Sequence, residues 1–311
     1  LNIECEDKVK QACKKKLDCG HYCYGYTGEK YCTPCLDKGC AKGTGLTQTG
    51  DDYCRICGVE RLSNAPCIRS KCGHLFHLAC ITTRIQKRWH SPRITFSFCN
   101  CPLCKQWLEF PPDSAIQNMM LENMALYKDI RWKAHERLKY ENRLKDEKLV
   151  TLGSPYYNKP EDYAFAIYSY YQCYKCKKPY FGGLKRCEEF MQEEENEKGE
   201  FKWEELVCAS CSDVGVTVEN CPKHGKDFIE FKCKFCCSIA QWFCWGNTHF
   251  CDPCHVRQCN GDHVSKKKPS ELPACKGKAT CPLKIDHPPN GTEFALGCSL
   301  CRNVVNSNLN F

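Results

Sequence analysis

Cysteine is the feature of this chain that most limits its fold, because 32 of its 311 residues are cysteines. They recur in Cys-x2-Cys and Cys-x2-His pairs, beside Gly-His and Cys-Pro dipeptides, and this spacing is typical of zinc knuckles rather than of a disulfide framework. Thiolates that hold zinc require a reducing compartment, so the pattern favours an intracellular, cytoplasmic protein. We therefore expect small zinc-stabilised α+β modules in place of one large hydrophobic core.

The rest of the composition narrows the class of partner. The hydrophobic share is 42% with cysteine counted, which is low for a single large core. The net charge of +8 is modest, and its basic residues are dispersed except at 14–16 and 266–268, so we expect no nucleic-acid partner. No signal peptide or long apolar run is present, so we expect no membrane insertion. The chain starts at Leu1, which we interpret as the start of a fragment.

The first group of cysteines and histidines lies in residues 1–40. It predicts an N-terminal zinc module with one or two ions, which would act as a docking or spacer finger. Residues 41–50 are rich in Gly and Thr and predict a flexible linker. Cys5 is a further candidate ligand beside the main set, which is Cys13, Cys19, His21, Cys23, Cys32, Cys35 and Cys40.

Residues 51–110 hold the second group, with eight ligands in the order Cys-Cys-Cys-His-His-Cys-Cys-Cys. Eight ligands suffice for two tetrahedral zinc sites. The spacing over residues 54–104 resembles a RING domain of the H2 type. In that family the two sites are interleaved, which implies one set of Cys54, Cys57, His77 and Cys80 and another of Cys72, His74, Cys101 and Cys104.

The RING resemblance also implies a docking surface for a ubiquitin-conjugating enzyme (E2). The contact positions of the family correspond to Ile56, Trp89 and Pro102 in this chain. Many RINGs carry an arginine just after the last ligand, where it promotes direct transfer of ubiquitin to lysine. This chain has Lys105 there, and the departure weakens the expectation of direct transfer.

Residues 111–150 predict a linker helix, with its periodic part at 113–148 and a cap at Asp113 or Ser114. Its second half carries many charges, so we expect a solvent-exposed rod whose length, about 1.5 Å per residue, sets the separation of its ends. Residues 151–169 follow as an aromatic linker, and residues 170–311 as a tandem cysteine domain.

The tandem cysteine domain contains sixteen candidate ligands, enough for four zinc ions. The sequence does not show which knuckle pairs with which. The candidates are Cys173, Cys176, Cys208, Cys211, Cys221, His224, Cys233, Cys236, Cys237, Cys251, Cys254, Cys275, Cys281, His287, Cys298 and Cys301.

Three cysteines of this domain remain outside that count. Cys244 stands between Phe and Trp and is either a buried structural thiol or a thiol left free for chemistry. Cys259 and His263 lie in a loop, where they have no role unless one of them replaces Cys275 as a ligand. Cys187 lies in an acidic stretch without periodicity, so we expect a mobile loop at 182–203 whose neighbouring basic residues favour the thiolate.

Five segments carry a closer resemblance: CYKCKKPYFGG, ELVCASCSDV, CPKHGKDFIEFKCKFCC, FCWGNTHFCDPCH and HPPNGTEFALGCSLCRN. With the RING and the helix, their order resembles the C-terminal region of the Pam/Highwire family of giant neuronal ubiquitin ligases. The resemblance implies that Cys187 takes ubiquitin from the conjugating enzyme and that Cys244 then receives it as a thioester. It also implies a neuronal or axonal protein and, through regions upstream, an F-box protein as a partner.

Transfer from Cys244 to a threonine or serine hydroxyl requires a general base, and His255 is the candidate closest in sequence. The resemblance places an orienting carboxylate at Glu205. Trp245 and Phe250 would line a pocket for the threonine methyl group. The family has a further aromatic residue where this chain has Gln258.

Two other hypotheses compete with this covalent relay. The first is a RING adaptor that never bonds to ubiquitin and transfers it directly to lysine, with the C-terminal domain recruiting substrates. The second is a zinc-rich scaffold or nucleic-acid-binding protein, against which Ile56 and Pro102 argue because they match RING contact positions.

Overall fold

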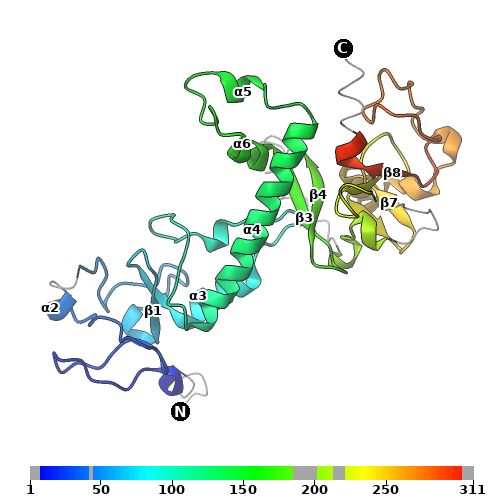
Figure 1. Cartoon of the computed structure of the whole chain (residues 1–311). Coiled ribbons are helices and arrows are strands. Elements are labelled where there is room, and N and C mark those ends of the chain that lie inside the picture. The colour runs from blue at the N-terminus through cyan, green and yellow to red at the C-terminus, as the bar shows by residue number, and fades with distance from the viewer. Residues whose placement is uncertain (1–7, 42–44, 185–201, 213–220, 303–311) are drawn as a thin grey trace. The chain divides into compact units, whose positions relative to one another are not determined.

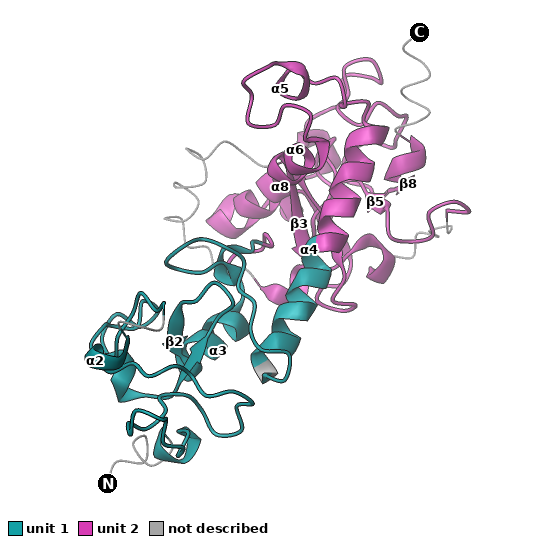
Figure 2. Ribbon diagram, turned by 60° about the vertical axis from the view of Figure 1, so that its left-hand side comes forward, with its two compact units in different colours: residues 1–90, 95–127 teal, residues 91–94, 128–311 magenta. Residues whose placement is uncertain are grey.

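The chain divides into two units (Figure 2). The computed structural model describes residues 8–41, 45–184, 202–212 and 221–302 (Figure 1). Unit 1 comprises residues 1–90 and 95–127, and unit 2 comprises residues 91–94 and 128–311. Apart from the longer helix α4 (Ala115–Tyr140), both consist of short helices and two-stranded sheets around clustered cysteines, which confirms the predicted class of small zinc-stabilised α+β modules.

Unit 1 is built around one antiparallel hairpin and one amphipathic helix. Strand β1 pairs with β2 so that Ile68 lies opposite Phe76. Ile81 and Ile85, one helical turn apart on α3, are buried with them. The elements of this unit are α2 (Lys38–Ala41), η1 (Leu62–Asn64), β1 (Cys67–Arg69), β2 (Leu75–His77), α3 (Leu78–Lys87), η2 (Ser97–Cys99) and the first half of α4 (Ala115–Tyr140).

Within unit 1, the N-terminal segment packs on the segment that resembles a RING. The amide of Cys67 donates to the carbonyl of Tyr24 at 2.7 Å. Gln48 is buried, and its side-chain amide both accepts from and donates to the backbone of Leu75, at 2.8 and 3.3 Å. Residues 45–50 are therefore held against the hairpin, in contrast to the flexible linker that their composition predicts.

Helix α4 is shorter than the predicted one and begins and ends at clear signals. Ser114 caps it, because its Oγ accepts from the amide of Gln117 at 3.3 Å. The helix ends before Asn142, which has a left-handed backbone with φ 55°, a conformation that asparagine tolerates. Its boundaries are Ala115 and Tyr140, so the predicted continuation to residue 148 is wrong.

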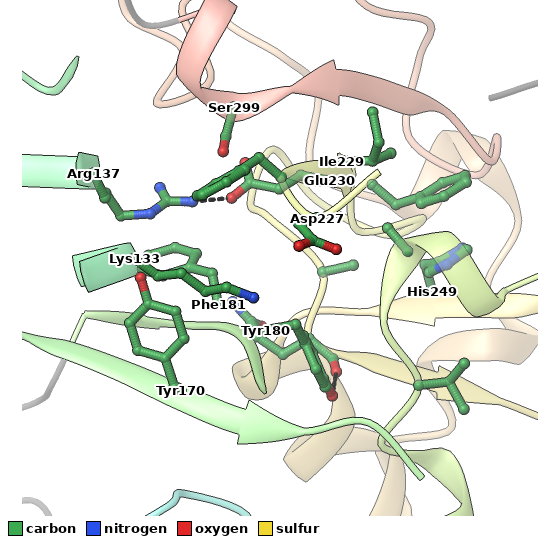
Figure 3. A pocket seen from close by; sticks show the side chains of 16 residues that line it. Lys133, Arg137, Tyr170, Tyr180, Phe181, Asp227, Ile229, Glu230, His249 and Ser299 are labelled. Atoms are coloured by element: carbon green, nitrogen blue, oxygen red, sulfur yellow. Dashed lines mark hydrogen bonds and ion pairs between the residues drawn. The ribbon is translucent and has the colours of Figure 1, made fainter. Parts of the chain in front are cut away.

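The second half of α4 is not the solvent-exposed rod that its charges suggested. Lys133 and Arg137 are only 4% and 3% exposed. Figure 3 shows both side chains reaching from α4 into a small cavity of unit 2, where Arg137 forms an ion pair with Glu230. Lys133 donates to the carbonyl of Pro179 at 3.2 Å, and Arg302 pairs with the other oxygen of Glu230 at 2.6 Å. The buried charges are therefore compensated within unit 2.

The described residues of unit 2 form three antiparallel strand pairs, β3 with β4, β5 with β8 and β6 with β7. Its elements, beyond the second half of α4, are α5 (Glu147–Val150), α6 (Pro160–Ile167), β3 (Tyr168–Gln172), β4 (Pro179–Leu184), η3 (Trp203–Glu205), η4 (Ala209–Cys211), β5 (Ile229–Phe231), β6 (Trp242–Cys244), β7 (Thr248–Phe250), α8 (Asp252–Arg257), the π-helical turn η5 (Gln258–Asp262), η6 (Val264–Lys266), η7 (Pro269–Glu271) and β8 (Ala295–Cys298).

Residues 91–94, the middle of the insert in the RING-like segment, also belong to unit 2. The amide of Ile94 donates to the carbonyl of Tyr170 at 2.9 Å, and Arg93 forms a bridge with Tyr171. The insert thus adds a single bridge to β3. Among the described residues, none of the helices has both the length and the apolar character that crossing a bilayer requires.

Candidate active site

The eight ligands of the RING-like segment come together in two interleaved groups, as the resemblance implied. In each group the four donor atoms lie within 4.8 Å of one another. Around His77, Nδ1 faces the sulfurs of Cys57 and Cys80 at 3.9 and 3.8 Å, while Nε2 contacts the carbonyl of Arg61 at 2.9 Å. Metal-binding histidines characteristically donate their second nitrogen in this way. The groups are Cys54, Cys57, His77 and Cys80, and Cys72, His74, Cys101 and Cys104.

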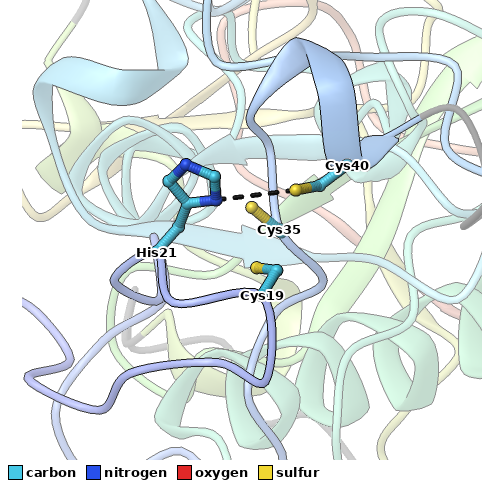
Figure 4. A group of neighbouring side chains, drawn as sticks. All are labelled: Cys19, His21, Cys35 and Cys40. Carbon is cyan, nitrogen blue, oxygen red and sulfur yellow. Dashed lines mark hydrogen bonds between the residues drawn. The ribbon is translucent and has the colours of Figure 1, made fainter.

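Among the described residues of the N-terminal module, Cys19, His21, Cys35 and Cys40 come together in a group of the same kind (Figure 4). Nδ1 of His21 lies 3.5 Å from the sulfur of Cys40. The predicted ligands Cys13 and Cys23 lie together beside the buried carboxylate of Glu29, to which Cys23 donates at 2.9 Å. Cys32 does not belong to the group in Figure 4.

In unit 2 the sixteen predicted ligands sort into four groups of four, a pairing that the sequence left open. Sulfur–sulfur distances such as 3.8 Å for Cys176–Cys208 and 3.6 Å for Cys221–Cys301 match the edge of a tetrahedron with zinc–sulfur bonds of about 2.3 Å. The donor sets therefore suit zinc. The groups are Cys173, Cys176, Cys208 and Cys211; Cys221, His224, Cys298 and Cys301; Cys233, Cys236, Cys251 and Cys254; and Cys237, Cys275, Cys281 and His287.

The predicted E2-contact residues differ in exposure. Ile56 and Pro102 are half-buried on the two ligand loops, and Lys105 is exposed, with its ammonium donating to the carbonyl of Pro102 at 3.0 Å. Trp89 is 7% exposed and packs near Phe98 with ring centroids 6.3 Å apart. A partner at this surface would therefore reach little of the Trp89 side chain. Val59, in the same loop as Ile56, is 74% exposed and was not singled out from the sequence.

Cys244 lies at the end of β6, in a hairpin that turns immediately after it. It pairs with Thr248 across the hairpin, and Trp245 and Gly246 take left-handed backbones in the turn. The thiol is 2% exposed. Burial, together with the charge of Glu205, raises the pKa of Cys244 well above its usual value. At rest Cys244 is therefore a protonated thiol.

His255 is positioned by α8, directly after the ligand Cys254. Its ring stacks on the indole of Trp242, with centroids 4.0 Å apart and planes within 1° of parallel. Nε2 of His255 lies 3.0 Å from Oε2 of Glu205, the last residue of η3. This hydrogen bond lowers the pKa of Glu205, whose carboxylate also accepts a hydrogen bond from Cys244. Glu205 thus contacts both the imidazole and the thiol, whereas the family resemblance implied only that it orients the imidazole.

The other ring nitrogen of His255, Nδ1, contacts Cys259, a residue for which the sequence predicted no role. Nδ1 lies 4.0 Å from the sulfur of Cys259, in the π-helical turn that continues α8. Cys259 is exposed. A signal for this contact was available, because residues four apart in a helix share a face.

The predicted substrate pocket is only partly open. Trp245 is 58% exposed, whereas Phe250 is fully buried, and their rings meet edge to face at 5.6 Å. Gln258, at the position where an aromatic residue was expected, accepts from the amide of Ser265 at 2.9 Å and so braces the turn. Cys187, the predicted first acceptor, lies outside the described residues.

Sequence comparison relates the chain to two curated proteins over 97% of its length. It is 44% identical to the E3 ubiquitin-protein ligase MYCBP2 of Danio rerio and 42% identical to the E3 ubiquitin-protein ligase highwire of Drosophila melanogaster. The chain spans about 6% of the length of each of these relatives. No model of a known protein family matches it.

Proposed function

Because the chain belongs to the Pam/Highwire family of E3 ubiquitin ligases, we propose that it transfers ubiquitin through thiol intermediates to a hydroxyl group. In this proposal the RING-H2 segment at 51–110 binds a ubiquitin-charged conjugating enzyme through Ile56 and Pro102. Cys187 takes the ubiquitin and passes it to Cys244 as a thioester. The final acceptor is a threonine or serine of a protein substrate.

The observation that carries this proposal is the contact between Glu205 and His255 beside Cys244. The sixteen predicted ligands of unit 2 form four groups that do not include Cys244. His255 directly follows the predicted ligand Cys254, and Glu205 stands three residues before the predicted ligand Cys208. Metal binding at these groups would therefore fix the helix and the turn that present the two side chains. In this proposal zinc would contribute folding free energy at all the ligand groups, with two ions in the RING segment, four in the tandem cysteine domain and one or two in the N-terminal module.

The chain's own residues define the proton transfers. A carboxylate can only accept, so in the neutral imidazole Nε2 of His255 donates to Glu205 and Nδ1 keeps its lone pair. A substrate hydroxyl on the Nδ1 side would lose its proton to that nitrogen as its oxygen attacks the thioester carbonyl carbon. The bond to the sulfur of Cys244 then breaks, and the proton held by the imidazole of His255 passes to the departing thiolate. Trp245 would contact the acceptor residue.

One observation favours a second candidate, a RING adaptor that transfers ubiquitin directly to lysine. Cys244 is 2% exposed and its pKa is raised, as in a structural thiol. Thioester exchange at Cys244 therefore requires the hairpin turn at Trp245 to admit the incoming carbonyl.

By family membership we also expect a cytoplasmic protein of neurons and their axons that works with an F-box protein.

The test is to incubate the chain with ubiquitin-charged conjugating enzyme and to look for an adduct that a thiol reductant removes. Cys187→Ser is expected to abolish this adduct, and Cys244→Ser to leave it on Cys187 but to stop transfer to threonine. Hydroxylamine is expected to release ubiquitin from the final product, since esters are cleaved and amides are not. Lysine-linked product that survives both substitutions would support the adaptor instead.

A further inference from the structure

We propose that Cys259 is a second ubiquitin-accepting thiol of this site, served by Nδ1 of His255 as its base. The inference rests on the proposed function, because it assumes that ubiquitin thioesters reach the site. It adds to the relay an acceptor that stands on the opposite side of the imidazole from Glu205.

Three side chains form a line from carboxylate to imidazole to thiol. Oε2 of Glu205 lies 3.0 Å from Nε2 of His255, and the sulfur of Cys259 lies 4.0 Å from Nδ1. This is the order of groups that activates a cysteine nucleophile: the carboxylate orients the ring, and the ring removes the thiol proton. A contact of 4.0 Å is long for a hydrogen bond, as contacts of nucleophile and base are before substrate binds.

The same geometry argues against a metal site at these three residues. A metal ion bound by an imidazole sits on one ring nitrogen, and its other ligands surround it there. Here the carboxylate and the thiol flank opposite nitrogens of His255. Cys275, the residue whose place Cys259 was considered to take, hydrogen-bonds with Cys237 and Cys281 in a ligand group of its own. Cys259 is therefore available for chemistry.

The two thiols of the site differ in their exposure to solvent. Cys244 is 2% exposed, whereas Cys259 is exposed and open to a bulky acyl donor. The turn that carries Cys259 is braced, because Asp262 accepts from Arg257 and from Lys267 at 2.7 Å each. Partial burial and the nearby carboxylate of Glu205 raise the pKa of Cys259, so the group is a thiol at rest and needs a base to react.

The step balances without a further reactant. As the sulfur of Cys259 attacks the carbonyl carbon of the incoming thioester, its proton moves to Nδ1 of His255. The new carbon–sulfur bond forms and the bond to the donor sulfur breaks. The proton on the imidazole then passes to the departing thiolate, and the neutral ring is restored with Nε2 still donating to Glu205.

The experiment uses the full zinc-loaded chain in a Cys187→Ser background, so that the loop cysteine does not contribute. The probe is ubiquitin with a C-terminal vinyl ester, which bonds irreversibly to nucleophilic cysteines, and the labelled peptide is identified by mass spectrometry. With Cys244→Ser added, we expect one label at Cys259, and we expect at least tenfold less when Cys259→Ser or His255→Gln is added. His263→Gln, in the same loop, is the matched control and should change nothing.

Label at Cys244 of the Cys187→Ser chain, with none at Cys259 after Cys244→Ser, would overturn this inference and leave the proposed function standing. Alkylation by iodoacetamide provides a measurement that does not depend on ubiquitin transfer. We expect Cys259 to be alkylated at least five times faster in the wild-type chain than in His255→Gln, with zinc content unchanged. Equal rates would overturn the inference whatever the ubiquitin assays show.

Discussion

Two histidines flank the same metal knuckle of unit 2, and their surroundings are alike except on one side. His249 precedes Cys251 and pairs with Glu293 at 2.8 Å, and His255 follows Cys254 and pairs with Glu205 at 3.0 Å. The side chains of both histidines are at most 6% exposed. Each ring stacks on an aromatic ring 4.0 Å away, Phe231 in the first case and Trp242 in the second.

The difference lies at the second ring nitrogen. Nε2 of His249 contacts Oγ of Ser212 at 3.1 Å, and that hydroxyl also donates to the carbonyl of Ala209 at 2.9 Å. Nδ1 of His255 instead faces an exposed thiol. When both ring nitrogens of a histidine contact buried structural partners, the side chain serves to hold parts of the fold together. When one ring nitrogen faces an accessible nucleophile, the imidazole can exchange a proton with it. The comparison therefore identifies His249 as a matched structural control for His255.

Removal of zinc is expected to have the largest effect on folding and on ubiquitin transfer. It should remove the difference between the two histidines, because both lose their fixed surroundings. Both imidazoles lie beside the group of Cys233, Cys236, Cys251 and Cys254. Metal binding contributes about 10–16 kcal/mol per site in small zinc fingers, which is as large as the whole free energy of unfolding of a typical domain. A chelator should therefore eliminate the cooperative unfolding transition, followed by circular dichroism, together with every ubiquitin adduct. A chain that keeps its transition without metal would contradict the metal-built frame.

Substitution of the two histidines sharpens the comparison. We expect His255→Gln to lower transfer of ubiquitin to threonine by roughly 10²–10⁴-fold, the usual contribution of a general base. His249→Gln should leave the rate per folded molecule nearly unchanged but lower the free energy of unfolding by about 1–3 kcal/mol, because Glu293 and Ser212 lose a buried partner. Rates measured with a threonine peptide, together with urea unfolding curves, separate the two effects. Equal loss of rate in both variants would refute the assignment.

The sequence was sufficient for the ligands and insufficient for their pairing, for a physical reason. A zinc knuckle is local, so its two ligands are visible as a spacing of two residues. The tertiary fold decides which second knuckle completes the site. Cys221 and His224 meet Cys298 and Cys301. Cys301 stands 80 positions after Cys221 and 77 after His224. No spacing rule connects such distant segments.

The charged half of α4 was misread for a related reason. Lysines and arginines usually remain in water unless they are paired, so a charge-rich helix predicts an exposed surface. Arg137 is buried because its partner Glu230 stands on β5, 93 residues further along the chain. In the candidate site, only the family resemblance indicates Glu205, since it stands 50 positions before His255 in the chain. Cys259 follows His255 by four residues, so helical spacing predicts their contact, whereas the composition around Cys259 predicts a loop.

The two carboxylates provide a smaller test of the same contrast. Glu205→Gln keeps the size of the side chain but removes the charge that orients the donating nitrogen of His255. We expect transfer to threonine to fall by about 10–100-fold, in line with the loss of other residues that orient a functional side chain. Glu293→Gln should change the rate less than twofold and appear as a loss of stability alone. Steady-state assays of both variants at equal zinc content decide this, and a rate effect confined to Glu293→Gln would reverse the assignment.

Substitutions of the two aromatic rings that stack on the histidines are expected to have the smallest effects on transfer rate and stability. Trp242→Phe keeps an aromatic face under His255 but removes the indole nitrogen, which donates to Asp252 at 3.0 Å. We expect a loss of about 1 kcal/mol in the free energy of unfolding from that hydrogen bond, and a decrease in transfer of a few fold because the imidazole is less firmly held. Phe231→Leu, under His249, should lower stability by about 1 kcal/mol through weaker packing, with no change in rate. If the rate responded equally to both substitutions, the ring under His255 would have no special part in positioning the base, and its role would reduce to packing.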